Sequence, residues 1–184
     1  MIFSVGVLPL VGAIALILLF LNPFLNPGPL FYRQERMGYR RTRFRIWKFR
    51  TMRSSTRGVR AHGARLEQDR ITTFGRFLRV TRIDELPNVI NVLRGEMSLV
   101  GPRPEAWSHA EHFLDNVPHY AERFAMRPGL TGLAQVRGEY ADTPRTILRK
   151  ARFDRYYVKN PSCRLDAYIM FVTVSIMFNG SGAK

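Results

Sequence analysis

The sequence predicts an α/β fold, mostly helical with a small sheet, preceded by an N-terminal membrane helix. Three observations carry this prediction. Residues 2–21 form a continuous apolar run, two β-prone stretches flank Gly38, and several later segments repeat apolar residues at helical spacing. A chain of 184 residues is long enough for one domain with a real core. No internal linker divides it, so we expect an inserted helix over residues 1–21 and one cytosolic domain with interfacial helices over 22–184.

The composition indicates an anionic partner. Lys and Arg number 29 against 14 Asp and Glu, which gives a net charge of +15. Such an excess favours nucleic acid, an anionic membrane surface or a phosphate-rich substrate. The single cysteine, Cys163, excludes a disulfide within the chain.

The apolar run over residues 2–21 is long enough to cross a hydrocarbon core at about 1.5 Å per residue. Pro9 lies inside it and removes a backbone donor, so a helix would kink there. Two interpretations stay open: a plain transmembrane anchor, or a broken helix that dips into the membrane and returns to the same face. The segment 33–50 that follows is rich in arginine, which marks the cytosolic side and favours anionic lipid.

The first elements of the domain are a hairpin and a short helix. Residues 31–34 and 44–52 have strand character, with Gly38 in the loop between them. Residues 54–68 are polar and lack apolar periodicity, so we expect a surface loop or a short solvated helix. A short basic helix is expected over residues 73–80.

The next helix contains the most informative residues of the chain. Asp84 is a suitable N-cap, and Pro87 follows in the first turn, where its missing N–H costs little. Gly95 is expected to end the helix. The remaining elements are expected as follows: helix over 105–125 with an interruption near Pro118, a turn and short strand over 127–138, an amphipathic helix over 144–157 that faces either the core or a membrane surface, and a core or interfacial helix over 165–178.

The acid pair Asp84-Glu85 is surrounded in sequence by basic residues. A carboxylate can attack a phosphoanhydride, and such a site must neutralise the charge of its substrate with Mg²⁺ or arginine. Taken alone, the pair favours the structural interpretation, an N-cap aspartate beside a solvated glutamate, because such pairs are common. Pro102 and Pro104 restrict the backbone around Arg103, whose guanidinium suits bidentate phosphate binding.

These stretches, taken in order, resemble the bacterial sugar transferases, which are monotopic phosphoglycosyl transferases that act on polyprenyl phosphate. The similarity covers nearly the whole chain and rests on several long motifs in fixed order. They are the apolar helix with its internal proline, 27–38 (PGPLFYRQERMG), 48–52 (KFRTM), 69–79 (DRITTFGRFLR), Asp84-Glu85, 101–104 (GPRP), 127–136 (RPGLTGLAQV) and 156–160 (YYVKN) with Asp166.

The resemblance implies a two-step reaction at the cytosolic face of the bacterial inner membrane. Asp84 matches the nucleophile, which would take a sugar phosphate from a nucleotide diphosphate sugar and pass it to undecaprenyl phosphate. Glu85 matches the second acid, linked to Mg²⁺ or to activation of the lipid phosphate, and both acids are the candidate metal ligands. Pro9 would mark a re-entrant membrane helix, and Asp166 matches an acidic position to which we assign no role. The candidate phosphate-binding residues are Lys48, Arg50, Arg79, Arg103, Arg127 and Arg137.

Two departures from the family pattern matter. Only about seven residues precede Leu8-Pro9, an arm of about 12 Å, which predicts either a shallow insertion or a missing N-terminal stretch. Arg82 stands where the family often has a small polar residue, so phosphate affinity or specificity would differ.

The expected function is therefore a polyprenyl-phosphate sugar-1-phosphate transferase that starts an exopolysaccharide, O-antigen or glycoprotein glycan. We expect a UDP-sugar, undecaprenyl phosphate and anionic lipid as partners, with a homodimer permitted and no nucleic acid. The alternatives are a membrane-tethered nucleic-acid-binding protein, which the charge of +15 suggests, and an inactive assembly scaffold. No sequence feature identifies the sugar.

Overall fold

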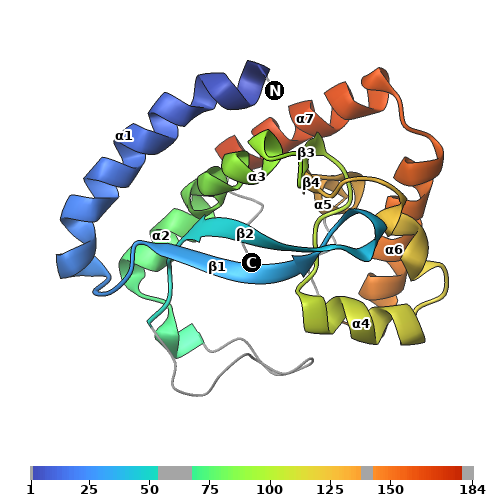
Figure 1. Cartoon of the computed structure of the whole chain (residues 1–184), viewed down its shortest axis with the longest axis horizontal. Helices are drawn as coiled ribbons and strands as arrows, with labels where there is room; N and C mark the ends of the chain where they lie inside the picture. The colour runs from blue at the N-terminus through green and yellow to red at the C-terminus, as the bar shows by residue number, and fades with distance from the viewer. Residues whose placement is uncertain (1, 54–67, 138–142, 180–184) are drawn as a thin grey trace.

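The computed structural model describes residues 2–53, 68–137 and 143–179. It confirms a mostly helical protein with little sheet: two sheets of two strands each are present in these ranges. Helix α1 extends along one side of the molecule, and α4 and α6 lie on the opposite side, beyond the first hairpin (Figure 1). The expectation for residues 54–68 falls almost entirely outside the described residues.

The hairpin consists of β1 (Phe31–Met37) and β2 (Arg43–Phe49), paired antiparallel, with Phe31 opposite Phe49. The predicted strands are confirmed with slightly different bounds. Gly38 has ordinary extended backbone angles, so its role in the turn is steric. A Cβ at this position would lie 2.9 Å from the ring of Phe44. The left-handed conformations of the turn fall on Arg40 and Arg41 instead.

Behind β2 lie α2 (Thr73–Val80), the 3₁₀ helix η3 (Ile83–Asn88) and α3 (Val89–Leu93). The prediction that Asp84 is an N-cap is wrong. Arg82 occupies the N-cap position in a left-handed conformation, and Asp84 lies in the first turn. An N-cap side chain normally accepts from the amide two or three residues later, and the third residue after Asp84 is Pro87, which has no N–H.

A second sheet pairs β3 (Ser98–Val100) with β4 (Gly129–Thr131) in parallel. The strand in 129–131 was expected, whereas β3 was not. The two strands approach closely because Gly129 lacks a side chain: a Cβ there would meet the Gly101 amide nitrogen at 2.2 Å. The other elements are η1 (Tyr39–Arg41), η2 (Gln68–Arg70), α4 (Trp107–Asn116), η4 (Tyr120–Ala125), α5 (Leu133–Val136), α6 (Pro144–Lys159) and α7 (Cys163–Asn179).

Helix α1 (Ile2–Leu25) continues through Pro9 and ends four residues beyond the predicted boundary. Val11 and Leu18 are buried against Phe49, Leu78 and Val89 of the domain. The opposite face is apolar and exposed, with Leu16, Phe20 and Phe24 each at least 70% accessible. Within the described residues this is the one helix long and apolar enough to span a membrane. One face of α1 packs on the domain and the other exposes large apolar side chains. This arrangement suits a helix that lies between protein and lipid.

Candidate active site

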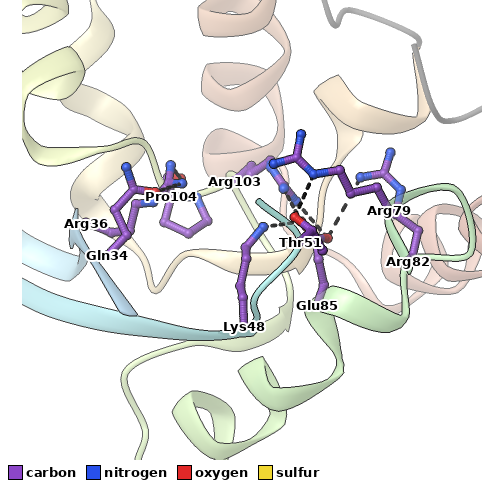
Figure 2. A network of polar contacts seen from close by, with 9 residues as sticks. All are labelled: Gln34, Arg36, Lys48, Thr51, Arg79, Arg82, Glu85, Arg103 and Pro104. Atoms are coloured by element: carbon purple, nitrogen blue, oxygen red, sulfur yellow. Dashed lines mark hydrogen bonds and ion pairs between the residues drawn. The ribbon is translucent and has the colours of Figure 1, made fainter. Parts of the chain in front are cut away.

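The two acids are presented by η3, which packs directly on β2. Four basic side chains from different elements surround them: Lys48 from β2, Arg79 and Arg82 from around the end of α2, and Arg103 from the loop after β3. Figure 2 shows Lys48, Arg82 and Arg103 contacting the Glu85 carboxylate from several sides, while Arg79 lies beside them and donates to Thr51. The segments are separated by up to 55 positions in sequence, so only the fold brings this charge together.

Glu85 is fully engaged by cations. Lys48 Nζ lies 2.6 Å from Oε1, Arg103 Nη1 lies 3.2 Å from Oε2, and Arg103 Nη2 also binds Oε1. Arg82 Nη1 adds a longer ion pair of 3.9 Å. Burial alone would raise the pKa of Glu85, but Arg103 and Lys48 outweigh it and hold the pKa well below its usual value. Glu85 is therefore a permanent anion that organises the cations around it.

Asp84 differs sharply from its neighbour. It is only 7% exposed, and its buried Oδ1 has no hydrogen-bond partner within the described residues. Burial raises the pKa of Asp84, and Lys48, Arg79 and Arg103 offset this only in part. A desolvated carboxylate oxygen without a hydrogen bond, such as Oδ1, is more nucleophilic than a solvated one, and the nearby cations still allow the carboxyl group to ionise.

Hydrogen bonds to the protein hold the basic side chains of the site in place. Arg79 donates through Nε to Thr51 Oγ1 at 2.8 Å, which leaves the other guanidinium nitrogens available to a ligand. Burial lowers the pKa of Lys48, although Glu85 partly restores it. The site therefore combines several positive groups with one unsatisfied carboxylate, an arrangement that suits a phosphate ester undergoing attack.

Four predicted residues lie apart from this cluster. Arg50 donates to the backbone carbonyls of Pro29 (2.6 Å), Met52 (3.0 Å) and Asn26, so its guanidinium anchors the end of α1. Arg127 and Arg137 are exposed, and Arg137 lies over the ring of Tyr168 at 5.7 Å. Asp166 accepts a hydrogen bond of 2.6 Å from Tyr157 on α6.

Sequence reasoning missed three residues beside the acids. Thr51 orients Arg79, and Arg36 donates to the Pro104 carbonyl at 3.1 Å. Asn88 is 5% exposed, its Oδ1 has no partner within the described residues, and it lines a small cavity with Lys48 and Arg103. The spacing of four residues from Asp84 to Asn88 was the available signal, because it is close to one helical turn.

The donor set suits a magnesium ion only in combination with a substrate. Asp84 offers an unpartnered carboxylate oxygen, whereas both oxygens of Glu85 already contact cations. No cluster of three or more His, Cys, Asp or Glu side chains occurs in the described part of the chain. Mg²⁺ is commonly held by one or two carboxylates together with substrate phosphates, so the acids fit that mode and not a cage made of protein alone.

Comparison with known proteins decides the family. Residues 1–180 match the family model described as bacterial sugar transferase. The chain belongs to the bacterial sugar transferase family. Several relatives are about 40% identical to it over the aligned residues.

Three relatives illustrate the range of the family. A UDP-N-acetylgalactosamine-undecaprenyl-phosphate N-acetylgalactosaminephosphotransferase of Aeromonas hydrophila is 40% identical over 98% of this chain and 43% of its own length. A UDP-glucose:undecaprenyl-phosphate glucose-1-phosphate transferase of Caulobacter vibrioides is 43% identical over 86% of this chain and 60% of its own length. An exopolysaccharide production protein of Rhizobium leguminosarum is 41% identical over 90% of this sugar transferase and 91% of its own length. The chain thus spans about half the length of the first two relatives and nearly all of the third.

Proposed function

We propose that this sugar transferase moves a sugar-1-phosphate from a UDP-sugar to undecaprenyl phosphate and releases UMP. The observation that carries the proposal is the contrast within the acid pair. Glu85 is saturated by cations, while the adjacent Asp84 keeps a buried oxygen that has no hydrogen-bond partner in the described part of the chain. The names of two relatives, which specify UDP-sugars and undecaprenyl phosphate, support this substrate class.

The first step forms a covalent intermediate on Asp84. A carboxylate oxygen of Asp84 attacks the phosphorus that bears the sugar, and the anhydride bond to the nucleotide breaks. The bonding electrons leave with the UMP oxygen, so UMP departs as the leaving group. In the second step an oxygen of undecaprenyl phosphate attacks the same phosphorus. The bond to Asp84 breaks, and the ionised carboxylate is restored.

The cations stabilise the negative charge that develops on the transferred phosphate. Lys48, Arg79 and Arg103 are placed to do so, and Glu85 fixes Lys48 and Arg103 in direction. A magnesium ion held by Asp84 or Glu85 and by substrate phosphate would supply further Lewis-acid stabilisation. Arg127 and Arg137 are exposed, so a phosphate role for them would have to lie at the rim of the site.

The placement at the membrane is part of the same proposal. The exposed apolar face of α1 enters the bilayer, and the domain stays on the cytosolic side. Pro9 lies within the continuous helix, so a return to the same face requires α1 to kink at that residue. Helix α6 presents exposed Leu148 and Tyr156 among basic side chains, which favours contact with anionic lipid. The expectation of a homodimer and the exclusion of nucleic acid stay predictions.

The decisive test is nucleotide release. The protein should be incubated with undecaprenyl phosphate, Mg²⁺ and a series of UDP-sugars, and the nucleotide products separated. We expect UMP with at least one sugar. Release of UDP would show transfer of the sugar without its phosphate and would refute the mechanism. Salt-sensitive DNA binding with no response to any UDP-sugar would favour the nucleic-acid alternative.

A further inference from the structure

The loop that carries Arg103 is fastened along its whole length. Its four carbonyl groups from residue 102 to residue 105 each accept a hydrogen bond, in order from the Gly129 amide (3.0 Å), the Arg123 guanidinium (2.6 Å), the Arg36 guanidinium (3.1 Å) and the Met37 amide (3.2 Å). The donors come from three elements: Arg36 and Met37 from β1, Arg123 from η4 and Gly129 from β4. The carbonyl of Arg103 itself is the one bound by Arg123.

Arg123 is a buried cation that binds groups of the protein itself. Its side chain is 3% exposed, and Nη2 lies 2.9 Å from Asp154 Oδ2 on α6, whose side chain is 2% exposed. The contact is an ion pair by distance and lacks hydrogen-bond alignment, because Oδ2 has no hydrogen-bond partner within the described residues. Nη1 contacts the hydroxyl of Tyr120. The same guanidinium therefore joins the Arg103 carbonyl to a carboxylate on a different helix.

A second link runs from the far end of the same loop to the same helix. Glu105 forms an ion pair with Lys150, one turn before Asp154 on α6, and lies 3.8 Å from Arg123 Nη1. Helix α6 thus holds the loop on both sides of Pro104. Its Ile147 and Ala151 pack into the core beside Phe113 and Tyr120, so the helix is itself a fixed support.

Buried charges of this kind need a reason beyond stability. Removing an ion pair from water costs so much that an apolar replacement is often as stable. The reaction proposed above uses neither Arg123 nor Asp154 on the substrate. Their shared contact with the Arg103 carbonyl offers the reason, because the direction of the Arg103 guanidinium toward Glu85 depends on where that backbone lies.

We infer that the buried pair Arg123–Asp154 is a positioning device for Arg103, through which α6 sets the catalytic arginine against Glu85. The expected effect on kcat rests on the proposed function. The expected effect on the position of the loop does not. Arg123 and Asp154 act through another residue, so their loss should reduce turnover more than substrate affinity.

A double-mutant cycle tests the kinetic consequence. Arg123→Lys keeps the charge but cannot reach the carbonyl and the carboxylate together, and Asp154→Asn keeps the shape but removes the charge. We expect kcat for UMP release to fall roughly 10- to 100-fold with a smaller change in KM, as small misplacements near chemistry do. In an Arg103→Ala background the same substitutions should cost about twofold or less, because the residue they position is gone. Full, multiplicative losses in that background would overturn the inference.

The matched control is Arg155→Gln, which breaks a partly exposed ion pair of 3.1 Å with Glu122 between the same two elements, α6 and η4. It should leave kcat near the wild-type value. A loss equal to that of Arg123→Lys would show that any weakening of the α6–η4 contact suffices, and would refute a specific role for the buried pair.

Amide hydrogen exchange provides a readout that needs no activity. The amides of Met37 and Gly129 donate to the loop carbonyls, so their exchange reports whether the loop is seated. We expect faster exchange at both in Arg123→Lys and Asp154→Asn, and wild-type exchange in Arg155→Gln. Unchanged exchange in both buried variants would overturn the inference even if UMP release is confirmed. If the wild-type protein releases no UMP, the proposed function fails and the exchange result alone decides.

Discussion

Two buried polar clusters of the protein differ in how fully their polar atoms are hydrogen-bonded. One contains Arg50 and Asn26, and the other contains Lys48 and the acid pair. At the junction of α1 with the domain, Asn26 is fully buried and donates a hydrogen bond of 2.8 Å to the Arg50 carbonyl. The Arg50 guanidinium in turn donates to three backbone carbonyls. At the acid pair, Asp84 keeps an oxygen with no partner among the described residues. A satisfied cluster stabilises architecture, whereas an unsatisfied carboxylate among cations marks the place for chemistry.

The largest effect should come from Asp84→Asn. An amide cannot act as the nucleophile, so UMP release should fall roughly 10⁴-fold or more. The same change removes a buried charge that the fold does not satisfy, so the thermal midpoint should stay level or rise. Normal turnover in this variant would exclude Asp84 as the nucleophile. A large drop in the thermal midpoint would show that the carboxylate is a structural partner, which would erase the contrast with the Arg50 cluster.

Arg103→Lys should have the next largest effect. Lysine keeps the charge but loses the two-pronged contact with Glu85, and we expect kcat to fall on the order of 10²-fold. The measurement is steady-state UMP release at saturating UDP-sugar. Arg94→Lys, a change at the exposed residue directly after α3, is the control and should stay within about twofold of wild type.

Arg50→Lys tests the opposite cluster. A single ammonium cannot serve all three carbonyls, so we expect a loss of about 1–3 kcal/mol in unfolding free energy. The effect on kcat of the folded fraction should be less than tenfold, smaller than that of Arg103→Lys. Thermal unfolding in detergent micelles, with activity normalised to folded protein, measures both. A kcat loss as large as that of Arg103→Lys, with unchanged stability, would return Arg50 to the phosphate-binding group.

The smallest effect concerns pH, where the two acids have opposite signs. The raised pKa of Asp84 means that activity, which needs the ionised form, declines on acidification before an ordinary aspartate would protonate. The lowered pKa of Glu85 contributes stability above the usual glutamate pKa, and this is lost as pH falls toward its folded-state value. In Glu85→Gln the acid-side fall in stability should therefore be shallower. An identical stability profile in that variant would contradict the assigned ion pairs.

The sequence pattern predicted elements with a periodicity of their own better than the short strand that depends on a distant partner. The hairpin, the helix over residues 73–80 and the amphipathic helix before residue 160 were all visible in periodicity and turn residues. The strand at residues 98–100 was not, because three residues in a parallel pair carry no alternation of their own. Its existence depends on Gly129, which lies about thirty residues away.

The site was predictable in its acids and only partly in its cations. The resemblance pointed to Asp84 and Glu85, yet the sequence could not distinguish Arg50 from Arg79 or Arg103. All three are arginines in basic stretches, and their roles differ because of carbonyl groups contributed by distant segments. The sequence also predicted the wrong N-cap. Asp84 lies in the first turn after Arg82, and Pro87 has no N–H to offer it.

The most direct test of the central claim is a single-turnover measurement without the lipid acceptor. When the protein is mixed with UDP-sugar alone, we expect a burst of UMP equal to the active protein, together with a mass increase of one sugar phosphate located at Asp84. Addition of undecaprenyl phosphate should discharge the adduct. If no UMP appears until the lipid phosphate is added, and no adduct forms, then transfer is direct and the account of Asp84 is wrong.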